Sequence, residues 1–332
     1  TREQAEEVLR AAEAAAAQAG PAEDAHPLLT AEQAGPAGDW DAATARRWQW
    51  TISLWKNEGL NATQAQALAK DENERVIAAL MSRYEERLSA YQSVDFDDLI
   101  GEVVRIFKEE SELEVWKENS NGEFALLKTY PICRWSGELG PKIKEGDRQA
   151  PEGFYSITPG QMNPNSQYHL AFDLGFPNAF DRALGRYGTN LMVHGDCSSS
   201  GCYAMTDEGI AEIYALARES FKGGQRTFQV QAYPFRMTAE NMVRHRNNPN
   251  IPFWRMLKEG SDTFEVTRAQ PKVNFCGKRY VFNATPVDPR AKFEAAAPCP
   301  EYTQPDELQQ ALAARSKDLS QMMASAGAFT PV

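Results

Sequence analysis

The sequence lacks any long apolar run and the glycine-rich signatures of nucleotide binding. Although 42% of its 332 residues are hydrophobic, no apolar stretch reaches the about 18 residues that a membrane-spanning helix needs. It contains no Gly-x-x-x-x-Gly-Lys-[Ser/Thr] loop and no Gly-x-Gly-x-x-Gly pattern. We therefore expect no membrane span, no P-loop and no Rossmann-type dinucleotide site.

Positive charge is also scarce. Lys and Arg number 35 against 46 Asp and Glu, which gives a net charge of −11, and the basic residues form no cluster. Because nucleic-acid binding requires basic clusters that neutralise phosphates, we expect no nucleic-acid partner. The length permits one large core and an accessory region. The composition does not indicate an oligomeric state.

The cysteines are few and odd in number: Cys133, Cys197, Cys202, Cys276 and Cys299. In an oxidising compartment at least one of them stays free or pairs between chains. We expect the free one to be Cys202. A Cys276–Cys299 bridge could close a C-terminal loop, but unpaired buried thiols fit the sequence equally well, and the pairing stays open.

Three regions are expected, namely a helical N-terminal region (1–98), a central region (99–240) and a C-terminal extension with helices and a short hairpin (241–332). The start, Thr1-Arg2-Glu3-Gln4, lacks the layout of a signal peptide and is typical of a mature or trimmed chain. The first region predicts three helices: 1–19, one with an apolar stripe of Trp48, Ile52 and Trp55, and one from Asn61 or Thr63 to about Tyr91. Their aromatic stripes predict internal packing or a surface for a partner.

The central region changes to a strand period. Residues 103–107, 113–116 and 124–127 alternate, and Asn119-Ser120-Asn121-Gly122 predicts a hairpin turn. Further predicted elements are strands at 154–157, 168–174, 191–193 and 227–233, helices at 206–221, after Thr238 and at 305–324, and a hairpin about 276–278. The predicted fold class is α+β, with a mainly antiparallel, sandwich-like or barrel-like core flanked by helices.

Residues 191–206 hold the main candidates for chemistry. His194 follows a strand-like run, and Gly201 precedes Cys202. Acyl transfer by a thiol needs a base, so we predict Cys202 as nucleophile and His194 as general base. Gly201 lets successive backbone N–H groups face an oxyanion. Thr206 is the predicted cap of a helix whose first-turn amides would favour a thiolate at Cys202.

Three alternatives compete with this interpretation. Cys202 could be a small buried apolar residue and His194 a core histidine. His194, Cys197 and Cys202 could provide three zinc ligands, but no fourth ligand is placed by the sequence. A Cys197–Cys202 disulfide could also lock the nucleophile.

The pattern His194-Gly195 followed by Ser199-Ser200-Gly201-Cys202 resembles the catalytic domain of the L,D-transpeptidases (YkuD type). The short His-to-Cys spacing and the run Cys-Tyr-Ala-Met-Thr-Asp-Glu-Gly from Cys202 resemble its YafK-like branch. The similarity begins near Val103, includes 146–155 and 162–169, and continues to about Thr238. The commoner YkuD pattern has a longer loop, His in place of Ser200, and often Arg or Asn in place of Tyr203 and Ala204.

The resemblance implies an enzyme that acts on peptidoglycan stem peptides in the periplasm of a Gram-negative bacterium. Cys202 would attack the carbonyl on the L-centre of meso-diaminopimelate and expel D-Ala, and an amine of a second stem would resolve the thioester into a 3-3 or 1-3 cross-link. It implies that the Gly195 carbonyl orients His194, with Asp196 as the alternative, and that the amides of Gly201, Cys202 and Tyr203 form the oxyanion hole. No metal and no organic cofactor is implied.

The substrate contacts are expected on polar side chains around this pair. Arg182 or Arg186 would meet a substrate carboxylate, and His169, on an alternating strand, is interpreted as a core or supporting histidine. The full set of expected substrate contacts is Asn163, Ser166, Tyr168, His169, Arg182, Arg186, Ser199 and Ser200. Two alternatives stay open: a YafK-like hydrolase that releases peptide or lipoprotein, and a non-catalytic peptidoglycan-binding scaffold.

Overall fold

The computed structural model describes residues 47–48, 51–52, 54–55, 60–90, 101–119 and 121–328. The chain divides into two compact units, 1–54 and 55–332. In the first unit the described residues are helical, and the Thr51 hydroxyl donates to the Arg47 carbonyl at 3.0 Å. The helix predicted over 1–19 lies outside the described residues.

Two helices replace the single long helix predicted from Asn61 onward. In α3 (Ala62–Leu68), the Asn61 side chain accepts a hydrogen bond from an amide of the first turn. Before α4 (Glu72–Ala90), the Asp71 carboxylate accepts one from the Glu74 amide at 2.8 Å. The prediction of one helix was wrong because Asp71 caps a new helix, and this local hydrogen bond competes with continuation of the first one.

The larger sheet has the strand order β3-β2-β1-β10-β5. Its strands are β1 (Glu102–Phe107), β2 (Glu112–Glu118), β3 (Phe124–Pro131), β5 (Gly153–Ile157) and β10 (Phe228–Tyr233). All neighbours are antiparallel except β1 and β10. The predicted turn at 119–122 joins β2 to β3, so the predicted antiparallel hairpin is confirmed.

The second sheet has the order β4-β9-β8-β7-β6 and consists of short strands. These are β4 (Arg134–Trp135), β6 (Met162–Asn163), β7 (Ala171–Asp173), β8 (Met192–His194) and β9 (Tyr203–Ala204). The strand predicted over 168–174 is shorter than expected because His169 has a φ of 67°, a left-handed conformation that interrupts a strand. The α+β class is confirmed, and the described strands close no barrel.

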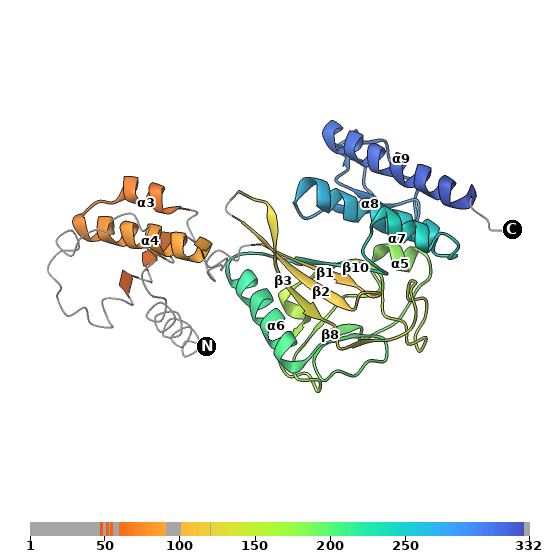
Figure 1. Cartoon of the computed structure of the whole chain (residues 1–332), viewed down its shortest axis with the longest axis horizontal. Coiled ribbons are helices and arrows are strands. Elements are labelled where there is room, and N and C mark those ends of the chain that lie inside the picture. Colours follow the sequence, from red (N-terminus) through yellow and green to blue (C-terminus); the bar gives the residue numbers. More distant parts are fainter. Residues whose placement is uncertain are drawn as a thin grey trace. The chain divides into compact units, whose positions relative to one another are not determined.

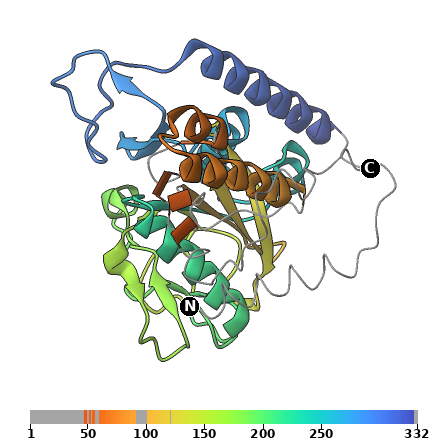
Figure 2. The same cartoon turned by 90° about the vertical axis from the view of Figure 1, so that its left-hand side faces the viewer.

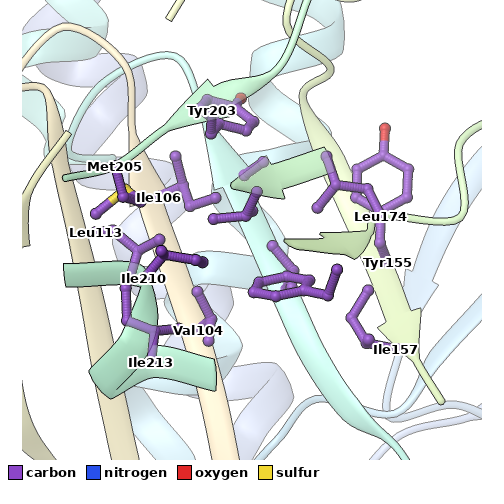
Figure 3. Close-up of a cluster of buried hydrophobic side chains, with 14 of the residues drawn as sticks. Val104, Ile106, Leu113, Tyr155, Ile157, Leu174, Tyr203, Met205, Ile210 and Ile213 are labelled. Carbon is purple, nitrogen blue, oxygen red and sulfur yellow. The ribbon is translucent and has the colours of Figure 1, made fainter. Parts of the chain in front are cut away.

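One hydrophobic cluster joins the two sheets to α6 (Asp207–Lys222), as Figure 3 shows. Val104 of β1, Tyr203 of β9 and Ile210 of α6 are each 0% exposed. The predicted start of α6 is confirmed, since the Thr206 hydroxyl accepts from the Gly209 amide at 3.0 Å. The helix ends at Gly223, also as predicted. This packing fixes the position of the loop between β8 and α6.

The C-terminal part covers the other face of the larger sheet (Figure 1). Trp254 and Phe282 pack there with Phe107, Phe154 and Tyr233. In Figures 1 and 2 α9 (Asp306–Ala328) lies along the outside of this part, in contact with α7 (Ala239–Arg244) and α8 (Ile251–Thr267). No helix in the described ranges has the length and apolarity to cross a membrane.

The elements of this part confirm the predicted hairpin, the Thr238 cap and the final helix. They follow the short helices η2 (Pro159–Gln161) and α5 (Ala179–Ala183) in the chain. The elements are α7 (Ala239–Arg244), α8 (Ile251–Thr267), β11 (Val273–Cys276), β12 (Arg279–Phe282), β13 (Thr285–Pro286), β14 (Tyr302–Thr303) and α9 (Asp306–Ala328).

Candidate active site

The register of β7, β8 and β9 decides which side chains share a face. Phe172, Val193 and Tyr203 are aligned across the three strands and are each 0% exposed in the core. Successive residues of a strand point to opposite faces. The residues on either side of these three therefore lie together on the opposite face.

Two rows of side chains lie on this opposite face. The first row, across β7, β8 and β9, contains Ala171, His194 and Ala204. The second row contains Asp173, Met192 and Cys202. Cys202 directly precedes β9 and is placed by continuing the register of β8 and β9 by one residue. Cys202 and His194 are thus diagonal neighbours on adjacent strands, roughly 8 Å apart at their Cα atoms by strand spacing and rise. The predicted nucleophile and base share one face.

His194 is held by its own backbone neighbour. Its side chain is buried, and Nδ1 lies 2.6 Å from the Gly195 carbonyl oxygen. Since a carbonyl only accepts, Nδ1 carries the proton and Nε2 is left as the basic nitrogen. The Tyr168 ring lies against the imidazole with centroids 4.7 Å apart. Burial lowers the pKa of His194 below its ordinary value, which keeps the ring neutral and able to accept a proton.

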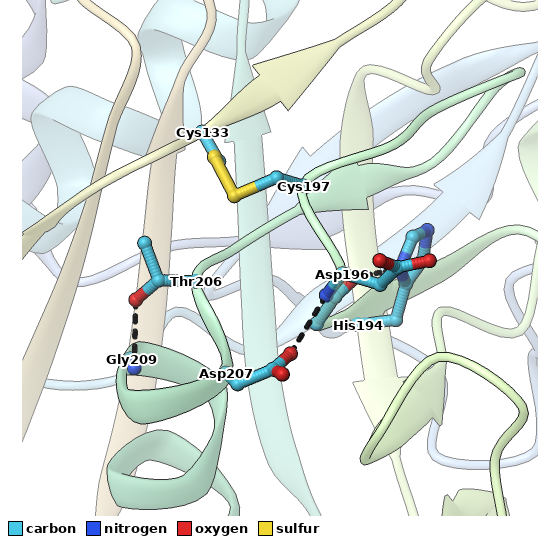
Figure 4. Close-up of a disulfide and its surroundings, with 8 residues drawn as sticks. Cys133, His194, Asp196, Cys197, Thr206, Asp207 and Gly209 are labelled. Atoms are coloured by element: carbon cyan, nitrogen blue, oxygen red, sulfur yellow. Dashed lines mark hydrogen bonds between the residues drawn. A yellow bond between two sulfur atoms is a disulfide. The ribbon is translucent and has the colours of Figure 1, made fainter.

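The loop after His194 is fixed by hydrogen bonds from both sides. The Gly195 amide donates to the Tyr168 and Leu170 carbonyls, and the Asp196 amide donates to the Asp207 carboxylate at 2.9 Å, as Figure 4 shows. A Cβ on Gly195 would lie 2.5 Å from that carboxylate oxygen, so no larger residue fits at position 195 without displacement. Asp207 therefore holds the Gly195 carbonyl in place for His194.

A disulfide ties the same loop to the segment before β4. Cys133 and Cys197 are bonded, as Figure 4 shows. Cys276 and Cys299 form a second disulfide, and Cys202 is free, as expected. The alternative of a Cys197–Cys202 disulfide is therefore wrong. Cys197 is also unavailable as a zinc ligand because its sulfur is already in a covalent bond.

Burial dominates the chemistry of the Cys202 thiol. The Met192 amide donates to Sγ at 3.5 Å, and Sγ lies 3.5 Å from the Asn190 carbonyl oxygen. Burial raises the pKa of the thiol above its ordinary value, and the Asp173 carboxylate raises it further, while the Met192 amide and Lys142 oppose the shift. Burial therefore opposes the thiolate that the nearby helix start was expected to favour.

The predicted oxyanion amides converge on a side chain of their own loop. The amides of Cys202 and Gly201 point at the Ser199 hydroxyl oxygen, at 3.1 and 3.4 Å. That hydroxyl donates to the Cys202 carbonyl at 2.7 Å and lies 3.2 Å from the Ser136 hydroxyl. Tyr203 belongs to β9, paired with β8. For the first two amides to hold an oxyanion, the Ser199 hydroxyl has to move aside.

Several expected substrate residues lie beside the pair. Asn163 aligns with Ala171 and so extends the row that contains His194. Tyr168 is 44% exposed over His194, and the Ser166 hydroxyl accepts from its amide at 3.0 Å. Ser200 is exposed on the nucleophile loop. These residues outline a polar surface next to the reacting atoms.

His169 differs from its interpretation as a core or supporting histidine. It is exposed and lies before β7. The strand prediction failed at this residue because its left-handed backbone precedes the β7 ladder.

The two arginines of the α5 segment are engaged elsewhere. Arg186 lies 3.0 Å from the Asp181 carboxylate, its side chain is 9% exposed, and it stacks on the Phe180 and Phe253 rings. The exposed Arg182 donates to the Pro177 carbonyl. Among the described residues, the side-chain contacts of these arginines are to Pro177, Asp181, Phe180 and Phe253 and not to Cys202 or His194. The expected substrate carboxylate contact is therefore not preformed by these residues.

Two charged residues near Cys202 were not predicted from the sequence. Asp173 shares the row of the nucleophile, and the buried Lys142 lies beside Gly188, with its ammonium bonded to Asp147 and to the Lys144 carbonyl. Strand alternation could have placed Asp173 on the face of Ala171. No sequence signal of this kind exists for Lys142, since it lies in a glycine-rich loop.

One family comparison concerns the N-terminal third. A family profile described as UvrD/REP helicase N-terminal domain matches residues 4–121, which is 118 of 332 residues. The matched range contains no Gly-x-x-x-x-Gly-Lys-[Ser/Thr] loop and ends in the hairpin between β2 and β3. The match therefore carries no nucleotide-binding residues with it.

Two solved structures are similar to part of the chain. One is the helical cell shape determining protein Pgp2 from Campylobacter jejuni, with 18% identity, a TM-score of 0.34 and coverage of 53% of this chain and 72% of that chain. The other is Bdellovibrio bacteriovorus Bd1075, with 16% identity, a TM-score of 0.30 and coverage of 52% and 75%. At these scores the similarity has no weight for function.

The sequence relatives are much closer. The chain is 48% identical over 178 residues to the protein named "Putative L,D-transpeptidase YafK" of Escherichia coli (strain K12), covering 54% of this chain and 72% of that protein. The protein of the same name from Escherichia coli O157:H7 matches equally well. With this identity over more than two thirds of the relative, the chain belongs to the YafK family of L,D-transpeptidase-like proteins.

Proposed function

We propose that this chain is a peptidoglycan L,D-transpeptidase of the YkuD type, which works in the periplasm of a Gram-negative bacterium through a Cys202 acyl-enzyme. The observation that carries the proposal is the placement of a free thiol and an Nδ1-protonated histidine on neighbouring rows of one sheet face. Membership of the YafK family supports the reaction class. The resemblance to the YkuD pattern supports the choice of stem peptides as substrate.

The first half-reaction starts from two neutral groups. As Cys202 Sγ attacks the carbonyl on the L-centre of meso-diaminopimelate, its proton passes to Nε2 of His194. The oxyanion binds the amides of Gly201 and Cys202 after the Ser199 hydroxyl turns toward Ser136. The protonated His194 then gives its proton to the amine of D-Ala, the C–N bond breaks, and a thioester is left on Cys202.

The second half-reaction needs a nucleophile that loses a proton. An amine of a second stem attacks the thioester, and His194 Nε2 removes its proton and returns it to the leaving Cys202 sulfur. An amine on diaminopimelate gives a 3-3 cross-link, and the amine of L-alanine gives a 1-3 cross-link. The polar surface at Asn163, Ser166 and Tyr168 is the proposed contact for the peptides.

A second candidate, hydrolysis, is favoured by the exposure of the nucleophile loop. Residues 196–198 and Ser200 are exposed, so water has a path to a thioester on Cys202. In this case water replaces the amine, and the protein releases a peptide or an attached lipoprotein. Exclusion of water decides between the two outcomes.

Mass spectrometry of purified muropeptides tests the proposal. The wild-type protein should release D-Ala and form new dimers, whereas Cys202→Ala should do neither. Ser198→Ala, a change to an exposed residue of the same loop, is the matched control and should behave like the wild type. Release of D-Ala or of a bound peptide without dimers would replace transpeptidation by hydrolysis. Binding without any conversion would replace both by a scaffold function.

A further inference from the structure

Asp173 is the acidic side chain in the row of the nucleophile. We propose that its carboxylate binds the ammonium group on the D-centre of the donor diaminopimelate, so that it selects the donor and positions its carbonyl over Cys202. This inference rests on the proposed function. It adds a specificity-determining residue that the sequence pattern does not mark.

Strand pairing places Asp173 close to Cys202. Asp173 pairs with Met192, and Cys202 is the next position in the same row on the far side of Met192. Two strand spacings put the Asp173 and Cys202 Cα atoms roughly 10 Å apart, with both side chains on one face. The side chain of diaminopimelate, which links the L-centre to the D-centre through a methylene chain, is long enough to span this separation.

The Asp173 carboxylate has one recorded partner, the Gly175 amide, which donates to it at 2.6 Å. Within the described ranges, no Lys, Arg or His forms an ion pair with the Asp173 carboxylate. Three other sheltered acids have cations within the chain: Asp147 pairs with Lys142, Asp181 with Arg186, and Asp262 with Lys258. Asp173 therefore differs from these three in having no cation within the part of the chain that the structure describes.

Partial burial without a cation is unfavourable for a carboxylate, and burial raises the pKa of Asp173 above its ordinary value. A substrate ammonium bound to the Asp173 carboxylate would offset the free-energy cost of burying its charge. The competing cation, Lys142, is unable to serve because its ammonium is already held by Asp147 and the Lys144 carbonyl. An ammonium forms a charge-assisted hydrogen bond with a carboxylate, which is stronger than a bond between neutral groups.

The same contact affects the nucleophile. The charged groups that act on the Cys202 thiol are Asp173, which raises its pKa, and Lys142, which lowers it and is itself paired with Asp147; neutral His194 lies on the next row. Neutralising Asp173 removes the negative charge that, in addition to burial, opposes thiolate formation. Binding of the correct donor therefore makes the thiol easier to ionise at the moment of attack.

The first experiment compares the wild type and Asp173→Asn, each with two substrates. The substrates are a stem tetrapeptide with a free ammonium on the diaminopimelate D-centre and the same peptide acetylated there. Acetylation should lower kcat/KM of the wild type by about 10- to 100-fold, the range of a hydrogen bond to a charged group. Asp173→Asn should lose a similar factor with the free peptide and discriminate less than about 3-fold between the two peptides.

The second experiment measures Cys202 without substrate. Because the other described cysteines are in disulfides, iodoacetamide reports on Cys202 alone. The pH midpoint of alkylation should be lower in Asp173→Asn than in the wild type, although the same variant is slower with the peptide. A merely structural role predicts loss in both assays. Glu208→Gln, which removes an exposed acid outside the row, should change neither result.

The outcomes separate the inference from the proposed function. Equal turnover of both peptides by the wild type would leave the transpeptidase proposal standing and overturn the role of Asp173. The same discrimination in Asp173→Asn as in the wild type would also overturn it, as would an alkylation midpoint that does not fall. Absence of turnover of either peptide by the wild type would remove the proposed function and the inference together.

Discussion

Two regions of the molecule treat buried polar groups in opposite ways. One region is the face of the larger sheet that α8 covers, which we call the paired face. There Lys108 pairs with Glu152 at 3.0 Å, and the second carboxylate oxygen of Glu152 accepts a hydrogen bond from Trp254 at 2.9 Å. On the face of the second sheet with Cys202 and His194, which we call the reactive face, these two side chains form hydrogen bonds only with backbone groups, and Asp173 pairs with no cation of the described ranges.

The difference shows which polar side chains can still form interactions with a substrate. A fully paired buried network stabilises one arrangement, and removing one member is costly. Groups without internal side-chain partners add less to stability but can interact with a substrate. The predictions below break or sharpen this contrast, from the largest expected effect to the smallest.

Replacing the histidine of the reactive face should have the largest effect. His194→Gln removes the base that accepts the Cys202 proton, and kcat should fall by about 10²- to 10⁴-fold, the contribution of general acid–base catalysis. The matched control is His245→Gln on the paired face, where the ring contacts Glu109 at 3.1 Å and stacks on Phe235. Steady-state kinetics with a stem peptide should show wild-type rates for this control, and equal losses in both variants would contradict the contrast.

Breaking the paired face should reduce stability. Lys108→Met leaves Glu152 without its cation at a site where both side chains are 0% exposed, and the free energy of unfolding should fall by about 3–5 kcal/mol. Denaturant titration measures this loss. Lys108→Met combined with Glu152→Gln keeps an acceptor for Trp254 and should recover part of it. A single variant as stable as the wild type would show that the pair is not important for this face.

The two disulfides allow a comparison between a bond that holds the loop after His194 and a bond that lies outside that loop. Removing Cys133–Cys197 or Cys276–Cys299 by paired Ser substitutions should cost about 2–4 kcal/mol of unfolding free energy in each case. Only the first bond holds the loop after His194, where Asp196 has a φ of 66°, so only its loss should also lower kcat/KM, by roughly 10- to 100-fold. Equal activity of the two variants at a temperature where both are folded would show that the first bond does not position the loop.

Local signals in the sequence predicted much of the fold. Thr206 and Gly223 mark the ends of α6, and residues 119–122 mark a hairpin, because caps and turns depend on a few neighbouring residues. The free state of Cys202 and its place near His194 were also predictable, since both residues lie within nine residues of one motif. The break at Asp71 was missed because the hydrogen bond from the Glu74 amide to the Asp71 carboxylate starts a new helix within a run that otherwise favours one helix.

Long-range contacts account for what the sequence did not reveal. The row of Asp173 and Cys202 depends on the register of β7, β8 and β9, which have only two or three residues each. Strands this short have too weak a pattern to fix their register from sequence. The contacts of Arg186 were not predictable for a similar reason, since its partner Asp181 and the Phe253 ring come together only in the folded chain.

The smallest expected effect concerns pH and the neutral state of the reactive face. Because burial lowers the pKa of His194, the unfolded chain takes up a proton before the folded one as pH falls below about 6.5. Stability due to this residue is therefore present above that pH and is lost on acidification, and His194→Gln should remove this part of the dependence in denaturant titrations. The acid limb of kcat/KM should likewise lie below the ordinary histidine value. An acid limb above that value would mean that His194 is charged in the resting enzyme, as in a thiolate–imidazolium pair, and the two faces would no longer differ in the way described.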